Sequence, residues 1–145
     1  MAISSANAAA QKTRRVETLA SGTSWTVPAG VTYVVSTLIG GGMGGAGGRN
    51  GTYGVSGNGG SVVTTTVNTT PGASIAYAVG AGGGGGSSLN YGASGGTTTF
   101  TGATTADGGA YSNDGNKTPN GGMAGNSNGT GFTGGAGQII LEYWV

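Results

Sequence analysis

Short runs of alternating apolar and polar residues recur along the chain, and each predicts a β-strand. In the first run, residues 23–27, Trp25 and Val27 alternate with serine and threonine. The second, residues 31–39, is nearly continuous and rich in β-branched residues, which is typical of a central strand. Further runs cover residues 61–67, 74–79, 97–100, 103–106 and 138–145. The pattern predicts seven strands, and so an all-β domain over residues 23–145.

The connections between these runs fall into two classes of length. The short turns are at residues 28–30, 68–73 and 101–102. The long connections are glycine-rich and lie at residues 40–60, 80–96 and 107–137. If neighbouring strands run up and down, the short turns share one end of the domain and the long connections share the other. We therefore predict an antiparallel β-sandwich, jelly-roll-like, with long glycine-rich loops at one pole. By the same parity, the segment before the first strand enters near the glycine pole and the C-terminus ends at the opposite pole.

Within the long connections, glycine follows a period of three. Residues 40–49 read GGGMGGAGGR, in which every third residue is of another type: Met43, Ala46 and Arg49. The same x-Gly-Gly triplet recurs with its first residue at Asn58, Ala81, Ser94, Asp107, Asn120 and Thr133. A period of three fits the polyglycine II helix, which has three residues per turn and no internal hydrogen bonds. Its N–H and C=O groups must bond to neighbours, so we expect the loops to pack side by side as polyglycine II helices with their non-glycine positions facing outward.

Composition changes this picture in two respects. The 145 residues, a one-domain length, include 36 glycines, and a glycine loses more conformational entropy on ordering than any other residue. We therefore expect dense backbone packing and self-association to stabilise the fold. Only 6% of the residues are charged and the net charge is +1, so charge repulsion does not hold the chain open. A flexible glycine-rich linker is the alternative, and the strand patterns between the tracts argue against it.

Residues 1–22 precede the first predicted strand and form a separate arm in this interpretation. An alanine run at residues 8–10 favours helix, and Ser21-Gly22 would end it. The arm holds three of the five basic residues, which is too few for a nucleic-acid-binding tail. We interpret it as an arm that docks onto a larger assembly, with a disordered leader as the alternative. The docking residues would be Lys12, Arg14 and Arg15.

Two targeting signals are not expected. A secretory signal contains a hydrophobic stretch, and residues 1–15 have none ahead of their basic residues. No apolar run approaches the ~20 residues that span a bilayer. We therefore expect neither secretion nor membrane insertion.

Little catalytic chemistry is available to the chain. It has no histidine and no cysteine, which excludes Ser-His-Asp and Cys-His arrangements and thiolate metal sites. Asp107 and Asp114 could meet as a carboxylate pair, but no other feature predicts a cleft around them. A GxGxxG pattern at residues 42–47 follows a strand but precedes no helix, and a chain this rich in glycine matches by chance. We expect no enzyme activity, no cofactor and no metal.

Recognition is the function class that remains. Aromatic, amide and charged side chains lie within the glycine connections, and such groups suit sugars or polar protein surfaces. Residues 110–120 are the best single segment because they interrupt the triplet rhythm. The alternative is that the aromatic residues fill gaps between glycine helices. The predicted receptor-binding residues are Tyr53, Tyr91, Tyr111, Asn113, Asp114, Asn116, Lys117 and Phe132.

Several motifs stand in a recognisable order along the chain. They are TVPAGV at residues 26–31, GGGMGGAGG at 40–48, VGAGGGGG at 79–86 and GAGQIILEYW at 135–144. Together they resemble the glycine-rich domain of bacteriophage tail-fibre and tail-tip proteins, over residues 23–145. The resemblance implies a virion component, made in the host cytoplasm, at or near the host-contacting tip and often built with polyglycine II helices. It fixes no receptor residues, so the residues predicted above come from this chain's own side chains.

Two functions follow as expectations. The first is a non-enzymatic tail-fibre or tail-tip protein that presents glycine-rich loops to a bacterial surface receptor, either a glycan or a protein. The second is a purely structural virion protein of a baseplate, tail or capsid, whose glycine pole packs against other subunits. The shortness of the chain, with no long fibre shaft, keeps the second open. In both, other virion proteins are partners and a homo-oligomer is expected, a trimer by analogy with fibres; neither nucleic acid nor a membrane is involved.

Overall fold

Two antiparallel β-sheets form the body of the molecule, in a computed structural model that describes residues 10–111, 125 and 128–145. The four-stranded sheet has the order β1-β7-β3-β4 and the three-stranded sheet the order β2-β5-β6. The strands are β1 (Arg14–Leu19), β2 (Ser24–Thr26), β3 (Tyr33–Ile39), β4 (Val62–Asn68), β5 (Ser74–Ala78), β6 (Thr99–Phe100) and β7 (Gln138–Trp144). The predicted all-β sandwich is confirmed. Within the described ranges, no helix has the length and apolar character needed to cross a membrane.

The core lies between the two sheets and follows the period-two patterns of the strands. On β3, Val34, Ser36 and Leu38 are fully buried, while Val35 and Thr37 between them are only partly covered. Trp25 on β2 joins the two sheets, because its ring lies 6.2 Å from that of Phe100 and 5.5 Å from that of Tyr143. The core comprises Leu19, Trp25, Val27, Val31, Val34, Leu38, Val67, Tyr77, Phe100, Ala106, Ile139, Leu141 and Tyr143.

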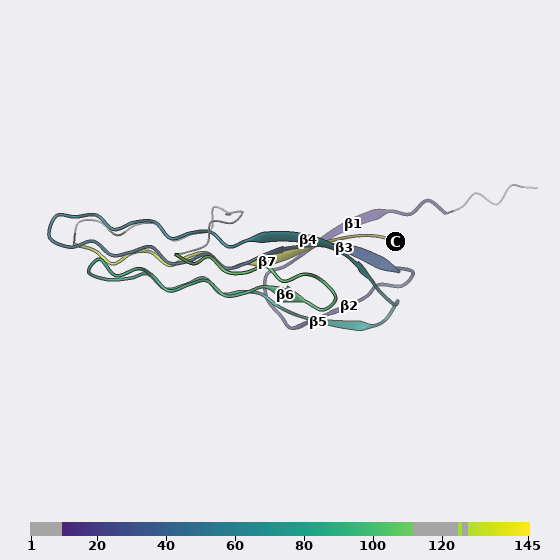
Figure 1. Cartoon of the computed structure of the whole chain (residues 1–145). Coiled ribbons are helices and arrows are strands. Elements are labelled where there is room, and N and C mark those ends of the chain that lie inside the picture. The colour runs from purple at the N-terminus through teal and green to yellow at the C-terminus, as the bar shows by residue number, and fades with distance from the viewer. Residues whose placement is uncertain (1–9, 112–124, 126–127) are drawn as a thin grey trace, which may run out of the picture.

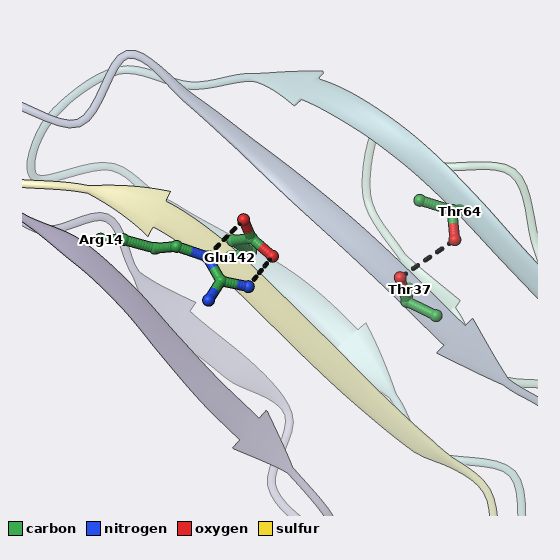
Figure 2. A network of polar contacts seen from close by, with 4 residues as sticks. All are labelled: Arg14, Thr37, Thr64 and Glu142. Carbon is green, nitrogen blue, oxygen red and sulfur yellow. Dashed lines mark hydrogen bonds and ion pairs between the residues drawn. The ribbon is translucent and has the colours of Figure 1, made fainter.

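The opposite face of the four-stranded sheet carries polar cross-strand pairs. Figure 2 shows Arg14 reaching from β1 to Glu142 on β7, with two hydrogen bonds of 2.6 Å, and Thr37 facing Thr64 across β3 and β4. The hydrogen bond with Arg14 is the main cause that holds the pKa of Glu142 below its usual value. Arg14, expected to dock onto another protein, is thus engaged within its own sheet.

Strand β1 corrects the interpretation of residues 1–22 as a separate arm, because residues 14–19 pair along their whole length with β7. The sequence pattern hid this strand. Leu19 is its one buried residue. β1 lies at the edge of the sheet, and its charged side chains point to both faces of that sheet. Inward-pointing Glu17 is satisfied by two donors, the indole Nε1 of Trp25 at 2.9 Å and the hydroxyl of Tyr143 at 3.3 Å.

A second correction concerns residues 103–106, which were expected to form a strand. Only an isolated bridge between Thr98 and Ala106 remains there. The other six predicted strands are confirmed, with ends shifted by one or two residues.

The start of β1 places the residues before it at the end of the sandwich opposite to the predicted entry point. Arg14 lies opposite Trp144, and the backbones of Thr13 and Val145 exchange two hydrogen bonds. Residues 10–13 therefore lie beside the C-terminus, at the end of the sandwich away from the glycine segments (Figure 1). The segment still joins β2 at the glycine end, as predicted, because Ser24 pairs with Ala76, near the end of β5 from which the second glycine connection leaves. Most of the alanine run expected to be helical lies outside the described residues.

The long glycine connections all leave the same end of the sandwich and extend away from it side by side (Figure 1). We call their described residues, 40–61, 79–98, 107–111, 125 and 128–137, the glycine bundle. Residues 40–48 are buried throughout and form its centre. Their successive N–H groups donate in turn to three antiparallel segments, so each segment receives a bond from every third residue. The donor–acceptor pairs are Gly40–Ser61, Met43–Asn58 and Ala46–Val55; Gly41–Gly96, Gly44–Ala93 and Gly47–Asn90; and Gly42–Gly135, Gly45–Phe132 and Gly48–Gly129.

This repeat of three follows the x-Gly-Gly rhythm of the sequence, since a β-strand would instead alternate with period two. The description of the segments as polyglycine II helices stays a prediction, which the hydrogen-bond repeat supports. The expectation that non-glycine positions face outward is wrong for the central segment. Met43 and Ala46 are 4% and 3% exposed, because several neighbouring segments bond to residues 40–48 and cover them.

Stability at alkaline pH should depend on Tyr143. Burial, with the nearby Glu17 carboxylate and its hydrogen bond, raises the pKa of Tyr143 above its ordinary value of 10.0. A pKa raised by folding means that the folded state holds the proton more tightly, so stability is retained below about pH 10 and lost as the pH rises beyond it. Urea unfolding between about pH 8 and 11 should show this loss, and Tyr143→Phe should reduce it. An identical decline in Tyr143→Phe would show that this phenol does not carry the effect.

Candidate binding site at the end of the glycine bundle

Two tight turns form the end of the glycine bundle farthest from the sandwich (Figure 1). In the first, Arg49 and Thr52 exchange two backbone hydrogen bonds, and Asn50 and Gly51 have positive φ. In the second, the N–H of Asn90 donates to the carbonyl of Ser87. Glycine and asparagine adopt positive φ readily, and their presence in the first turn is therefore expected.

Leu89 in the second turn is the exception. Its φ is 65°, a left-handed conformation that costs a residue with a Cβ roughly 1–2 kcal/mol. Ser88 beside it has a φ of 49°. The N–H of Leu89 donates to the carbonyl of Gly47, 2.9 Å away, which fixes this conformation. The result is a leucine side chain that stands 48% exposed at the end of the molecule.

A pocket of about 170 Å³ opens between these two turns. Its walls are Tyr53 and Val55 from one segment and Leu89 and Tyr91 from another; Ala46 and Gly47 of the buried central segment, with Gly54, complete it. We call it the tip pocket. Its four wall side chains are all exposed, from 48% for Leu89 to 70% for Tyr53.

Tyr111 extends the aromatic surface beside the tip pocket. Its ring centroid lies 4.0 Å from that of Tyr91, at an interplanar angle of 40°. A hydrogen bond with Tyr111 is the main cause that raises the pKa of Tyr91 above its ordinary value. Three of the predicted receptor-binding residues, Tyr53, Tyr91 and Tyr111, are thus brought to one end of the bundle.

The remaining predicted residues are placed otherwise. Phe132 is 60% exposed but lies on residues 129–135, and it does not line the tip pocket. Lys12 and Arg15 are exposed on β1 and the residues before it, at the other end of the molecule. Four more fall outside the described residues: Asn113, Asp114, Asn116 and Lys117.

Sequence reasoning missed Val55 and Leu89. A signal was present, because both are large apolar residues within glycine-rich connections, where no strand pattern would bury them. With them, the pocket presents more apolar than polar surface. Mostly apolar, concave sites with a few polar groups are typical of ligand-binding pockets.

Among the residues that the structure describes, none that line the tip pocket is charged at neutral pH. Its seven residues carry no ionisable side chain other than the two phenols, so the polar groups available are hydroxyls and backbone atoms. Within the ranges that the structure describes, no three His, Cys, Asp or Glu residues gather closely enough to hold a metal ion. The arrangement can bind a neutral partner by apolar contact and by hydrogen bonds from phenol groups.

Comparison with known proteins identifies the family of the chain. No curated protein matches the chain. A family model described as "Glycine-rich domain" matches residues 18–139, from the end of β1 to the start of β7. The match includes the glycine bundle, the whole of β2 to β6, the last two residues of β1 and the first two of β7. Because it spans most of the sequence, the chain belongs to the glycine-rich domain family.

Proposed function

We propose that this chain is a non-enzymatic virion component of a bacteriophage tail fibre or tail tip, and that its glycine bundle presents the tip pocket to a receptor on the bacterial surface. The observation that carries the proposal is the position of the exposed apolar side chains. Of the nine large hydrophobic residues that are exposed in the described ranges, six lie in the glycine bundle. They are Tyr53, Val55, Leu89, Tyr91, Tyr111 and Phe132.

Exposed apolar groups that gather in one place are characteristic of interaction sites. Here four of them surround one pocket at the end of a rigid projection. The strain at Leu89 supports the same reading, since an unfavourable backbone conformation that exposes a leucine adds nothing to folding. The proposal places the protein in the virion, with other virion proteins as partners and with copies of itself forming a homo-oligomer.

The alternative is a purely structural virion protein, predicted to pack against other subunits through its glycine pole, and a second surface, on the sandwich, supports the same role. The outer face of the four-stranded sheet exposes Val16 and Tyr33, and the ring of Tyr33 lies 5.7 Å from that of Trp144. This surface could pack against another subunit. It lies on the sandwich rather than on the glycine bundle, so variants there test packing through this surface separately from recognition at the tip pocket.

Adsorption to host cells tests the proposal. Phage particles carrying Tyr53→Ala with Tyr91→Ala should adsorb at least about ten-fold more slowly, because aromatic residues at the centre of an interface carry most of its binding energy. Tyr33→Ala removes an exposed tyrosine from the sandwich and is the matched control, with adsorption expected to stay unchanged. Normal adsorption by fully assembled double-variant particles would reject receptor recognition by this site, and loss of assembly in Tyr33→Ala would favour the structural alternative.

A further inference from the structure

Strand β1 forms one edge of the four-stranded sheet, and within the described ranges β7 is the one strand that pairs with it. Along an antiparallel pair, residues whose backbone groups bond to the neighbour alternate with residues whose groups point away. The two bonds that Thr13 and Val145 exchange fix this alternation for β1. It follows that the N–H and C=O groups of Arg14, Val16 and Thr18 point away from β7. An edge of this kind is a template for a further strand.

The side chains along this edge are open to contact. Arg14 to Val16 and Thr18 are exposed, and Glu17 is half-buried. Val16 stands 55% exposed, as one of three exposed large hydrophobic residues that the described structure places outside the glycine bundle. It is also the middle one of the three residues whose backbone groups point outward. A strand added here would therefore cover an apolar side chain at its centre.

We propose that two copies of this chain pair through β1, antiparallel and about a two-fold axis at Val16, so that their four-stranded sheets join edge to edge. In this arrangement Val16 faces Val16 of the second copy. Arg14 faces Thr18 of the second copy, and the reverse contact forms as well, because a two-fold interface is reciprocal. The three facing pairs exchange about six backbone hydrogen bonds.

Charge complementarity selects a second copy of this chain as the partner. The pairing places Arg15 opposite Glu17 of the other copy, twice, at the positions where facing side chains lie closest. Opposite charges that face each other across two strands stabilise the pairing. Glu17 can accept this contact. Trp25 and Tyr143 both donate to its Oε2, and a carboxylate has about four acceptor positions on its two oxygens.

The same charges disfavour the neighbouring registers. Charged residues on an edge strand often serve to prevent pairing. On β1, an axis one residue earlier would place Arg15 opposite itself, and an axis one residue later would place Glu17 opposite itself. Like charges directly opposite each other destabilise a strand pair. Of these three registers, the one centred on Val16 is therefore favoured.

The pairing also sets the direction of the two glycine bundles. β1 runs from the end of the sandwich near the C-terminus towards the end from which the bundle leaves (Figure 1). Antiparallel strands therefore send the two bundles in opposite directions, with both tip pockets away from the interface. The inference specifies the homo-oligomer of the proposed function, and it does not depend on what the tip pocket binds.

Cysteine cross-linking tests the register, because the chain has no cysteine of its own. In the proposed pairing the two Val16 Cα atoms lie about 5.5 Å apart, within the range of a disulfide. The two Thr18 Cα atoms lie about 14 Å apart, beyond that range. Val16→Cys should therefore form a disulfide-linked dimer at least about ten-fold faster than Thr18→Cys under mild oxidation. Equal rates, or faster linkage through Thr18→Cys, would overturn the pairing.

Analytical ultracentrifugation of the full chain tests whether the dimer forms without a cross-link, and it should appear at concentrations up to about 1 mM. Val16→Pro should be monomeric. Proline there removes an N–H that points away from β7, so no bond within the sheet is lost. Thr66→Pro on β4, at the opposite edge of the same sheet, is the matched control and should stay dimeric. A monomeric parent chain, or a dimer that survives in Val16→Pro, would overturn the inference.

The charge argument has its own variants. Arg15→Glu brings carboxylates opposite each other in the pairing, so it should weaken dimerisation at least about ten-fold. Arg15→Lys keeps the charge and should dimerise nearly as the parent chain does. Equal dimerisation by Arg15→Glu and Arg15→Lys would show that the facing charges do not select the partner.

These results are distinct from those of the adsorption test. If the chain is monomeric while adsorption depends on Tyr53 and Tyr91, the recognition function stands and the pairing through β1 fails. If the dimer forms through Val16 but adsorption does not need the two tyrosines, the pairing stands and the recognition function fails.

Discussion

Gly85→Ala is expected to destabilise the protein by roughly 3 kcal/mol, which lowers the melting temperature by about 10 °C for a domain of this size. A Cβ at position 85 would run into the backbone carbonyl of Gly131 on the adjacent segment. Backbone cannot rotate away as a side chain can, so the two segments must separate. That separation weakens the bonds from Gly131 to Gly86 and from Gly134 to Gly83.

Gly84→Ala is the matched control, one residue away in the same tract. A Cβ there meets nothing within 4 Å. The substitution should be neutral, or stabilising by up to ~1 kcal/mol, because alanine reduces the conformational entropy of the unfolded chain. Thermal unfolding followed by circular dichroism compares the two. Equal melting temperatures would mean that residues 80–86 and 129–135 are not in contact.

Thr98→Val is expected to cost about 2–4 kcal/mol, because it removes two buried hydrogen bonds without changing the shape of the side chain. Thr98 is fully buried where the sandwich meets the glycine bundle. Its hydroxyl donates to the carbonyl of Ile39 at 2.7 Å and accepts from the N–H of Gly80 at 2.9 Å. It thereby ties the end of β3 to the start of the second glycine connection.

Thr98→Ser keeps the hydroxyl and loses only a methyl group, so its cost should be about 1 kcal/mol. Chemical denaturation of both variants measures the difference. If Thr98→Ser were as destabilising as Thr98→Val, packing of the methyl group would matter more than the two hydrogen bonds.

The alternation of apolar and polar residues predicted most strands. Each strand buries one of its two faces in the sandwich, so every second residue is apolar. β1 was not predicted, because Arg15 and Glu17 point inward from this edge strand. Its inward positions are therefore not consistently apolar, and no alternation of apolar and polar residues marks it. Its inward carboxylate is tolerated only because Trp25 and Tyr143 donate to it, and those partners are distant in sequence. A prediction from the residue pattern of the segment itself could therefore not have found β1.

The glycine rhythm predicted a repeat of three and a shared pole, but not which segment would be central. Burial of Met43 follows from the number of neighbours around residues 40–48, and that number is a property of the assembled bundle. The tip pocket shows the same limit. Tyr53 and Tyr91 were predicted individually, whereas their meeting across one groove depends on the registers that pair Ala46 with Val55 and Gly47 with Asn90.

Amide hydrogen exchange of residues 41–48 tests most directly whether the glycine connections form an ordered, mutually bonded bundle. The N–H groups of these residues each donate to a neighbouring segment within a fully buried tract. They should therefore exchange as slowly as the amides of β3 and β7, far below the rate of an unstructured peptide. Exchange of these glycine amides at the rate of an unstructured chain, with the strands still protected, would contradict the account.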